Sequence, residues 1–247
     1  MTPIETATVQ ITTTDGPMSA YIATPVAQPA DDHAPGSRPG VIVAHQLFGV
    51  TRDVRAIADR LAAAGYTALA PDFFHREAPG VQLTADDEGR KRGFELLHGL
   101  SRTGVLEDVR AAGEHLTAHG AGAVGMLGLS MGGHLAFYAA TQLDLPVTVV
   151  LYAGWLTGAD IPLSRPDPTL ELSGGIKGLL VYIVGDRDHV ITAADREAIA
   201  GRLRQEGVRH EMVVVEGAAH AFLSEPGRQP YQDLAWERVE RALAELR

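Results

Sequence analysis

The order of strand-like and helix-like segments predicts an α/β protein with a mostly parallel central sheet of about eight strands and helices on both faces. Residues 41–44 form a short, wholly apolar run, which is typical of a strand buried on both faces. Segments of ten or more residues with helical spacing lie between such runs; residues 53–64 carry Val54, Ile57 and Leu61 on one face. Parallel strands need crossovers of this length, so both observations favour the same fold class.

Turn and cap residues set the expected ends of these elements. Asp15 and Gly16 predict a turn between the first two strands, Gly65 has the position of a helix C-cap, and Pro71 ends a strand. The segment 27–40 predicts a loop, and 155–178 an irregular excursion. We therefore expect strands at 8–13, 19–23, 41–44, 66–70, 124–127, 147–152, 179–184 and 211–215. Helices are expected at 53–64, 87–100, 105–119, 132–143, 193–206 and 231–246.

Length and composition favour one soluble domain that acts on a small molecule. The 247 residues, 45% hydrophobic and 21% charged, suit a single α/β domain over 1–247. No apolar run has the length of a membrane span, and the first residues lack the features of a signal peptide, so we expect a cytoplasmic protein that does not bind membranes. The net charge of -10 argues against nucleic acid as a partner. We expect a monomer or a small homo-oligomer.

The stretch VGMLGLSMGGH, residues 124–134, places one hydroxyl between glycines, after an apolar strand and before a helix. A nucleophile on such a sharp strand-to-helix turn needs tiny neighbours, because larger side chains at Gly128 and Gly132 would collide with strand and helix. Ser130 is therefore the candidate nucleophile, since the chain contains no cysteine. A serine nucleophile needs a histidine base and an orienting carboxylate, and the expected order along the chain is Ser, Asp, His.

Candidates for both partners follow two later strands in that order. The strand at 179–184 leads into Gly185-Asp186-Arg187-Asp188, and the strand at 211–215 leads into a loop that contains His220. Because the carboxyl ends of parallel strands meet at one edge of the sheet, these side chains are expected close to Ser130. The spacing leaves open which aspartate, Asp186 or Asp188, is the acid of the triad.

The chain resembles the dienelactone hydrolase family of the α/β-hydrolase fold. The stretches that carry the resemblance are VIVAHQLFGV, ADRLAAAGYTALAPDFF, GLSMGG, GDRDHV and GAAHAF. The resemblance implies Asp188 as the triad acid, with Asp186 bonded within its loop. It also implies an oxyanion hole formed by the backbone N–H groups of Leu47 and Met131. No metal or organic cofactor is implied.

Two departures from the family pattern change the expected chemistry. The family usually has cysteine where Ser130 stands and glutamate where Gln46 stands. A carboxylate can help deprotonate a thiol but is a poor base for an alcohol, so the pair of changes favours an ordinary Ser-His-Asp hydrolase. The family arginine that contacts a substrate carboxylate is replaced at the corresponding position by Ser224, which leaves Arg90 or Lys91 as the other candidate anion contact.

The remaining expectations concern the pocket and the activity. The expected pocket residues are Gln46, Phe48, Phe74, Trp155 and Arg90. The expected activity is hydrolysis of carboxylic esters or lactones through an acyl-enzyme. The alternatives are acyl transfer, thioester hydrolysis or carbon–carbon bond cleavage on the same triad, or a non-catalytic binding protein on this fold.

Several other motifs have plain structural interpretations. Residues 120–125 match G-x-G-x-x-G, but they follow a helix and precede a strand, so we expect a loop rather than a dinucleotide site. His115 and His119 lie on one helical face without a visible third ligand, so we expect no metal there.

Three further histidines are expected outside the catalytic chemistry. His45 is expected to have a structural or supporting role beside the oxyanion loop, and His134 to pack. His189 is expected to point away from His220.

Overall fold

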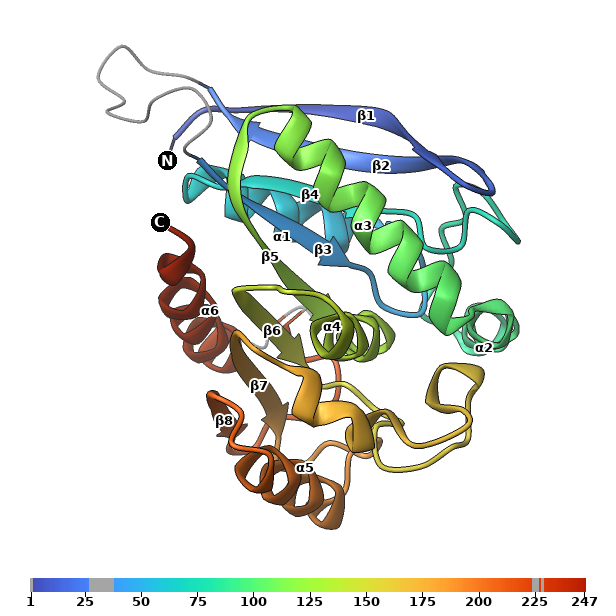
Figure 1. The fold of residues 1–247 in the computed structure, drawn as a ribbon, viewed down its shortest axis with the longest axis vertical. Coiled ribbons are helices and arrows are strands. Elements are labelled where there is room, and N and C mark those ends of the chain that lie inside the picture. The colour runs from blue at the N-terminus through green and yellow to red at the C-terminus, as the bar shows by residue number, and fades with distance from the viewer. Residues whose placement is uncertain (1, 27–37, 224–226, 228) are drawn as a thin grey trace.

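Eight strands form one sheet in the computed structural model, which describes residues 2–26, 38–223, 227 and 229–247 (Figure 1). The order across the sheet is β1-β2-β4-β3-β5-β6-β7-β8. The strands are β1 (Ile4–Thr13), β2 (Gly16–Pro25), β3 (Arg38–Ala44), β4 (Thr67–Pro71), β5 (Ala121–Leu129), β6 (Val147–Leu151), β7 (Leu179–Gly185) and β8 (His210–Val215). From β4 to β8 the neighbours are parallel, whereas β1–β2 and β2–β4 are antiparallel. The mostly parallel sheet of about eight strands is confirmed.

The strands differ from the expected ranges mainly at their ends. β1 and β2 pair over their whole length, from Ile4 opposite Pro25 to Thr13 opposite Gly16, so both are longer than predicted. The G-x-G-x-x-G segment was expected to be a loop, and this was wrong: residues 121–125 begin β5. Pairing with β3, as at Gly40 opposite Val124, makes this glycine-rich segment a strand, and glycines carry no side-chain alternation that could reveal it.

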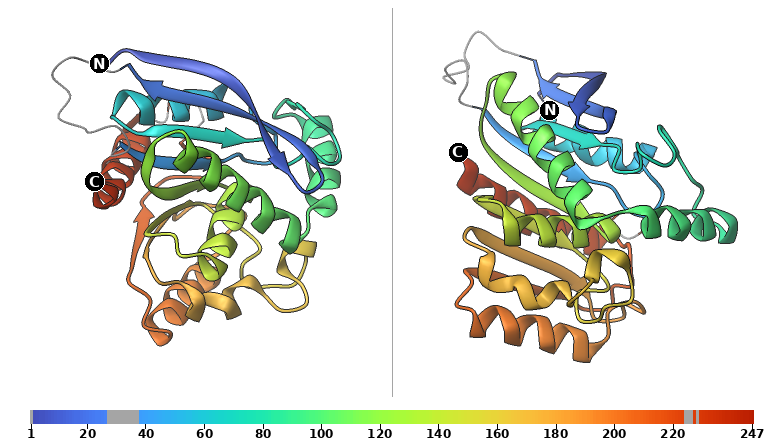
Figure 2. Two further views of the ribbon diagram at one scale, coloured as in Figure 1. Left: turned by 45° about the horizontal axis from the view of Figure 1, so that its top comes forward. Right: turned by 45° about the vertical axis from the view of Figure 1, so that its right-hand side comes forward.

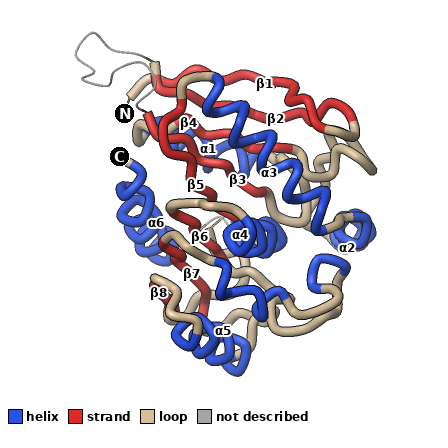
Figure 3. Tube along the Cα trace, viewed as in Figure 1, coloured by secondary structure: helices blue, strands red, loops and turns tan. Residues whose placement is uncertain are grey.

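Helices cover both faces of the sheet (Figure 3). The helices are α1 (Arg52–Ala63), α2 (Asp87–Gly99), α3 (Arg102–Ala118), α4 (Met131–Gln142), α5 (Ala193–Gln205) and α6 (Gln229–Leu243). α1 and α6 share one face, where Arg60 lies 4.1 Å from the ring centroid of Trp236. α3, α4 and α5 cover the other face, and α2 projects beyond them in the right-hand view of Figure 2. None of the described helices is both long and apolar enough to cross a membrane.

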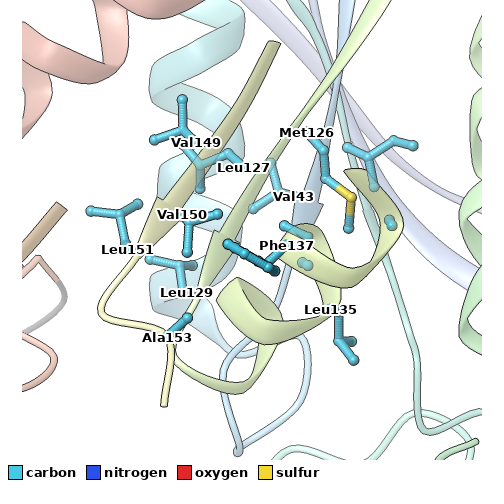
Figure 4. Packing of buried hydrophobic residues seen from close by; sticks show 14 of the residues in the cluster. Val43, Met126, Leu127, Leu129, Leu135, Phe137, Val149, Val150, Leu151 and Ala153 are labelled. Atoms are coloured by element: carbon cyan, nitrogen blue, oxygen red, sulfur yellow. The ribbon is translucent and has the colours of Figure 1, made fainter. Parts of the chain in front are cut away.

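The helix that follows Ser130 is buried on all sides. Residues 131–141 of α4 are all buried, as expected for a helix that is apolar around its whole circumference. Phe137 packs among the side chains of β5 and β6, including Leu129 and Val150 (Figure 4). Close packing of this kind resists displacement, so α4 gives the serine turn a rigid support.

A second buried contact fixes the irregular excursion between β6 and β7, which contains the short 3-10 helices η1 (Pro162–Ser164) and η2 (Thr169–Gly175). His134 of α4 is wholly buried; its Nδ1 lies 2.9 Å from the carbonyl oxygen of Gly154, and its Nε2 lies 2.9 Å from the Thr169 hydroxyl. A carbonyl only accepts hydrogen bonds, so Nδ1 carries the proton. The Thr169 hydroxyl beside Nε2 also donates to Leu163 O at 3.2 Å. His134 therefore packs, as predicted, and ties the excursion to α4.

Arg102 of α3 holds the same excursion from outside. Its guanidinium donates to the carbonyl oxygens of Leu163 and Asp167, both at 2.7 Å. Two helices thus fix the segment that contains Trp155.

The buried His134 is expected to make stability depend on acid. Burial lowers its pKa to about 4, below the ordinary value of about 6.5. Between these values the unfolded chain binds the proton and the folded chain does not, so stability is complete above about pH 6.5 and falls as the pH drops towards 4. In His134→Leu, the loss of unfolding free energy between pH 7 and pH 5 should be smaller by about 2 kcal/mol.

Urea unfolding at pH 7 and pH 5 measures this change for each protein. Any overall destabilisation that the substitution causes at pH 7 cancels, because each protein is compared with itself. His98→Gln, which changes an exposed histidine of α2, is the matched control and should keep the pH dependence of the unaltered protein. An unchanged pH dependence in His134→Leu would contradict the prediction.

Candidate active site

Three polar side chains come from the carboxyl ends of three parallel strands. Ser130 follows β5, Asp188 lies three residues beyond β7, and His220 lies five residues beyond β8. Two backbone hydrogen bonds join the last two loops: Asp186 N donates to Val215 O at 3.1 Å, and Arg187 N donates to Ala218 O at 3.0 Å. The two chain segments therefore reach the same place although 32 residues separate Asp188 from His220.

The backbone of Ser130 has the strained conformation expected for the turn. Its φ is 53° and its ψ is -113°, a region that non-glycine residues adopt only when the surroundings enforce it. Ser130 N donates to Leu151 O at 2.9 Å, and Ser130 O accepts from His134 N at 3.1 Å. Both backbone groups are thus held by the neighbouring strand end and by α4.

The glycines around Ser130 are explained by close backbone approaches. A Cβ added at Gly128 would lie 2.0 Å from Gly132 O. A Cβ at Gly132 would lie 2.1 Å from Ala44 O and 2.5 Å from His45 O. The expected collisions with helix and strand are confirmed: Gly128 faces the first turn of α4, and Gly132 faces the end of β3 and the loop that follows it.

A continuous chain of hydrogen bonds joins the three side chains. Ser130 Oγ lies 2.9 Å from His220 Nε2, and His220 Nδ1 lies 2.8 Å from Asp188 Oδ2. The Ser130 hydroxyl does not cap α4 and is directed to the imidazole. Asp188 accepts a hydrogen bond from the protonated Nδ1 of His220, which leaves Nε2 free to accept a hydrogen bond from the serine hydroxyl.

The two aspartates after β7 have different surroundings. The side chain of Asp188 is fully buried, and its Oδ1 accepts from Val190 N at 2.8 Å and from Ile191 N at 3.1 Å. Asp186 is exposed and accepts from Gly217 N at 2.6 Å. Asp188 is therefore the carboxylate that contacts His220, while Asp186 holds the loop that carries His220.

A glycine allows the two loops to meet. A Cβ added at Gly185 would lie 2.0 Å from Ala218 O. The first residue of Gly185-Asp186-Arg187-Asp188 therefore has no side chain because the backbone of the His220 loop occupies that space.

Aromatic rings surround the imidazole of His220. Tyr152 lies edge-on at 5.2 Å between ring centroids, and Tyr152 also contacts Phe222 at 5.4 Å. The exposed ring of His189 lies 5.7 Å from that of His220. The expectation that His189 points away from His220 was wrong, because the turn after Asp188 brings the next side chain back over the imidazole.

The loop expected to supply an oxyanion donor is buried beside the serine turn. Gln46 and Leu47 are each 7% exposed. Helix α2 packs directly on this loop, since a Cβ at Gly93 would lie 2.6 Å from both Leu47 Cγ and Leu47 O. On the other side, Leu83 N donates to Phe48 O at 2.9 Å. Met131 is the first residue of α4, where a helix does not use its own N–H groups.

The expected pocket residues separate into two groups. Phe74 is 1% exposed and packs on the His45 ring at 4.9 Å, so it lies in the core rather than on an accessible wall. Phe48 and Trp155 are half-buried. Phe94 of α2 meets Trp155 edge-on at 6.0 Å and was missed by the sequence analysis; a large exposed apolar residue on an otherwise polar helix face was the available signal.

Arg90 lies one helical turn before Phe94 and is exposed. Its Nη2 donates to Asp87 Oδ1 at 2.9 Å, so a carboxylate of the same helix already contacts this guanidinium. Lys91 is also exposed, and Ser224 lies outside the described residues.

One small cavity adjoins Trp155. It has a volume of about 140 Å³ and lies between the Trp155 segment and the beginning of α5, against Val190, Ile191 and Asp195. A larger hollow of about 710 Å³ lies between α3 and the first residues of β5, and its lining does not include Ser130, Asp188 or His220. Among the described residues, no group of three or more metal-ligating side chains could hold a metal ion.

The chain matches known proteins over nearly its whole length. Residues 18–246 match the dienelactone hydrolase family. A putative carboxymethylenebutenolidase of Synechocystis sp. is 29% identical over 247 aligned residues, which cover 96% of each chain. A putative carboxymethylenebutenolidase of Salmonella typhimurium is 30% identical over 208 residues, 83% of this chain and 73% of the relative.

Solved structures share the fold. The crystal structure of a putative dienelactone hydrolase from Klebsiella pneumoniae superposes with a TM-score of 0.85 at 24% identity, covering 98% of this chain and 99% of that one. The Pyrococcus furiosus esterase Pf2001 superposes with a TM-score of 0.69 at 20% identity, covering 98% and 93%. With the family match over residues 18–246, the fold and sequence together show that this chain belongs to the dienelactone hydrolase family and is a hydrolase of the α/β-hydrolase fold.

Proposed function

We propose that this protein hydrolyses carboxylic esters or lactones through an acyl-enzyme formed on Ser130. The observation that carries the proposal is the hydrogen-bond chain from Ser130 through His220 to Asp188, at 2.9 and 2.8 Å. Each member comes from the end of a different strand, so the contact is made by the fold and not by neighbours in sequence. Both distances lie within the range that proton transfer from a nucleophile to its base requires.

The reaction then proceeds in two halves on the same residues. Ser130 Oγ attacks the ester carbonyl carbon while His220 Nε2 takes the hydroxyl proton, and Asp188 stabilises the imidazolium that forms. His220 returns the proton to the leaving alkoxide, which departs as the alcohol; in a lactone it stays attached to the acyl group. Water deprotonated by His220 then attacks the acyl-enzyme, and the proton passes back to Ser130 Oγ as the acid is released.

The negative charge of the tetrahedral intermediate needs donors beside the serine. We assign this role to the backbone N–H groups of Leu47 and Met131. The support for Met131 is its place at the first position of α4, whose N-terminus also favours negative charge. The support for Leu47 is the contact of its loop with the same helical turn at Gly132.

We further propose that residues 1–247 act as one domain in the cytoplasm, as a monomer or a small homo-oligomer, on a small molecule. The single sheet takes strands from residue 4 to residue 215, which supports one domain. The net charge of -10 supports a small-molecule partner rather than nucleic acid.

The nucleophile can be tested by covalent labelling. A fluorophosphonate should inactivate the protein and modify Ser130, because the hydrogen bond to His220 makes this hydroxyl more nucleophilic than the other serines. Peptide mass spectrometry identifies the modified residue, and hydrolysis of p-nitrophenyl esters measures the loss of activity. Ser130→Ala is the control and should neither react nor hydrolyse. Labelling at another serine would contradict the assignment, and the lack of any labelling would favour a binding protein.

The triad acid can be tested with two matched amide variants. Asp188→Asn should lower kcat by roughly a thousandfold or more, because an amide stabilises the wrong tautomer of His220. Asp186→Asn should cost roughly tenfold or less, since an amide oxygen still accepts from Gly217 N and the loop stays in place. Steady-state kinetics on one ester measures both, and the reverse order of effects would make Asp186 the acid.

The preference for substrate charge follows from the groups around the pocket. Ser224 stands where the family has an arginine, and Asp87 already contacts Arg90. A charge-assisted hydrogen bond contributes about 1.5–3 kcal/mol, so without it kcat/KM should be roughly tenfold or more higher for a neutral p-nitrophenyl ester than for a dienelactone of similar size. A clear preference for the dienelactone would contradict this and point to Arg90 or Lys91 as the anion contact; loss of that preference in Arg90→Ala would identify Arg90.

A further inference from the structure

His45 is a wholly buried histidine whose two ring nitrogens both contact backbone groups. Its Nδ1 lies 2.7 Å from Gln46 O, and its Nε2 lies 3.2 Å from Phe73 N. The rings of Phe73 and Phe74 pack against it at 5.7 and 4.9 Å. The mechanism above does not use this side chain.

The two backbone partners determine the protonation of the ring. Phe73 N–H only donates, so Nε2 must accept and carries no proton. Gln46 O only accepts, so Nδ1 must carry the proton. Burial lowers the pKa of His45, with Gln46 O and the carboxylate of Asp72 acting in the opposite direction. The two contacts and the lowered pKa therefore favour one neutral tautomer, with the proton on Nδ1.

The hydrogen bond to Gln46 O has a geometric consequence for the next residue. The carbonyl of Gln46 and the N–H of Leu47 belong to one planar trans peptide, in which they point in opposite directions. Gly49 N also donates to Gln46 O, at 3.3 Å. Two donors thus hold the carbonyl on the His45 side, and the Leu47 N–H points to the opposite side.

The surrounding contacts leave this peptide little freedom. Gly132 of α4 lies against His45 O, and Gly93 of α2 lies against Leu47 O. The carbonyls on either side of the Gln46 carbonyl are therefore packed, and the Gln46 carbonyl itself accepts from His45 Nδ1. A rotated Gln46–Leu47 peptide would lose this bond and would turn the Leu47 N–H away.

We propose that His45 is a positioning residue of the oxyanion hole, which orients the N–H of Leu47 through its own hydrogen bond to the carbonyl of Gln46. The proposal rests on the proposed function, in which the Leu47 N–H stabilises the tetrahedral intermediate. His45 is wholly buried, so it acts through the backbone of Gln46 and Leu47 rather than on the substrate. It fixes the direction of one donor before substrate arrives, and such preorganisation is what makes an oxyanion donor effective.

Two amide variants distinguish the roles of the two ring nitrogens of His45. In His45→Asn the side-chain NH₂ can occupy the place of Nδ1 and donate to Gln46 O, but it cannot reach Phe73 N. In His45→Gln the amide can reach the place of Nε2 and bond Phe73 N, but it leaves Gln46 O without this donor. Both variants are neutral amides and differ in length by one methylene group.

The expected results are stated for kcat and KM of one p-nitrophenyl ester. His45→Gln should lower kcat by roughly ten- to a hundredfold with KM changed by less than threefold, since removal of a whole oxyanion donor costs about 10²–10³. His45→Asn should keep kcat within about threefold of the unaltered protein if the donor to Gln46 O is what matters. The rate of phosphonylation of Ser130 by a fluorophosphonate should fall in parallel with kcat, because its phosphoryl oxygen needs the same donors.

Three outcomes would overturn the proposal. One is an unchanged kcat in a folded His45→Gln; another is a loss of kcat in His45→Asn that equals or exceeds the loss in His45→Gln, which would indicate a role in packing around Phe73. Urea unfolding shows whether each variant is folded. The third needs no variant. The proposal expects ¹⁵N NMR of the unaltered protein at neutral pH to show His45 protonated at Nδ1, and a proton on Nε2 would overturn it. If the fluorophosphonate does not label Ser130 in the unaltered protein, the proposed function fails. This result is distinct from the three outcomes that overturn the role of His45.

Discussion

The site depends on one close approach between two backbone segments, the first turn of α4 and the loop that follows β3. At Gly132 the two lie so near that a Cβ would be 2.5 Å from His45 O, in the first residue of that loop. This approach places the strained serine turn directly beside the loop of Leu47. Because α4 is buried on all sides and β3 lies between β4 and β5, neither segment can withdraw without disturbing the core.

The two carboxylates after β7 have different roles: one contacts the catalytic histidine, and the other holds the loop that carries it. Asp188 is buried, but its oxygens accept from two backbone N–H groups and from His220, so its charge is compensated by fixed dipoles. Asp186 is exposed and holds the His220 loop by one hydrogen bond to Gly217 N. Asp188 therefore sets the direction of the imidazole, and Asp186 sets the position of the loop that carries His220.

Histidines have two different roles around the site because their burial differs. His45 and His134 are wholly buried, and burial lowers the pKa of each. A neutral ring has one donor and one acceptor. His45 uses both on backbone groups, whereas His134 donates to the Gly154 carbonyl and lies against the Thr169 hydroxyl. His220 is partly exposed and contacts the serine, where a ring must take up and release a proton.

The sequence by itself determined the elements and the motifs of this protein. Period-two and helical apolar patterns arise from neighbours along one element, so the strands, the helices and their alternation could be predicted. The serine turn, the Asp–His order and the family resemblance followed from short motifs whose geometry is local. Only the tertiary structure decided the contacts between distant segments: the strand at 121–125, the Phe94–Trp155 contact, the His189 ring over His220, the core position of Phe74 and the two partners of His45. Such contacts depend on how strand ends and loops meet in space, and no spacing within one segment records the distance to another.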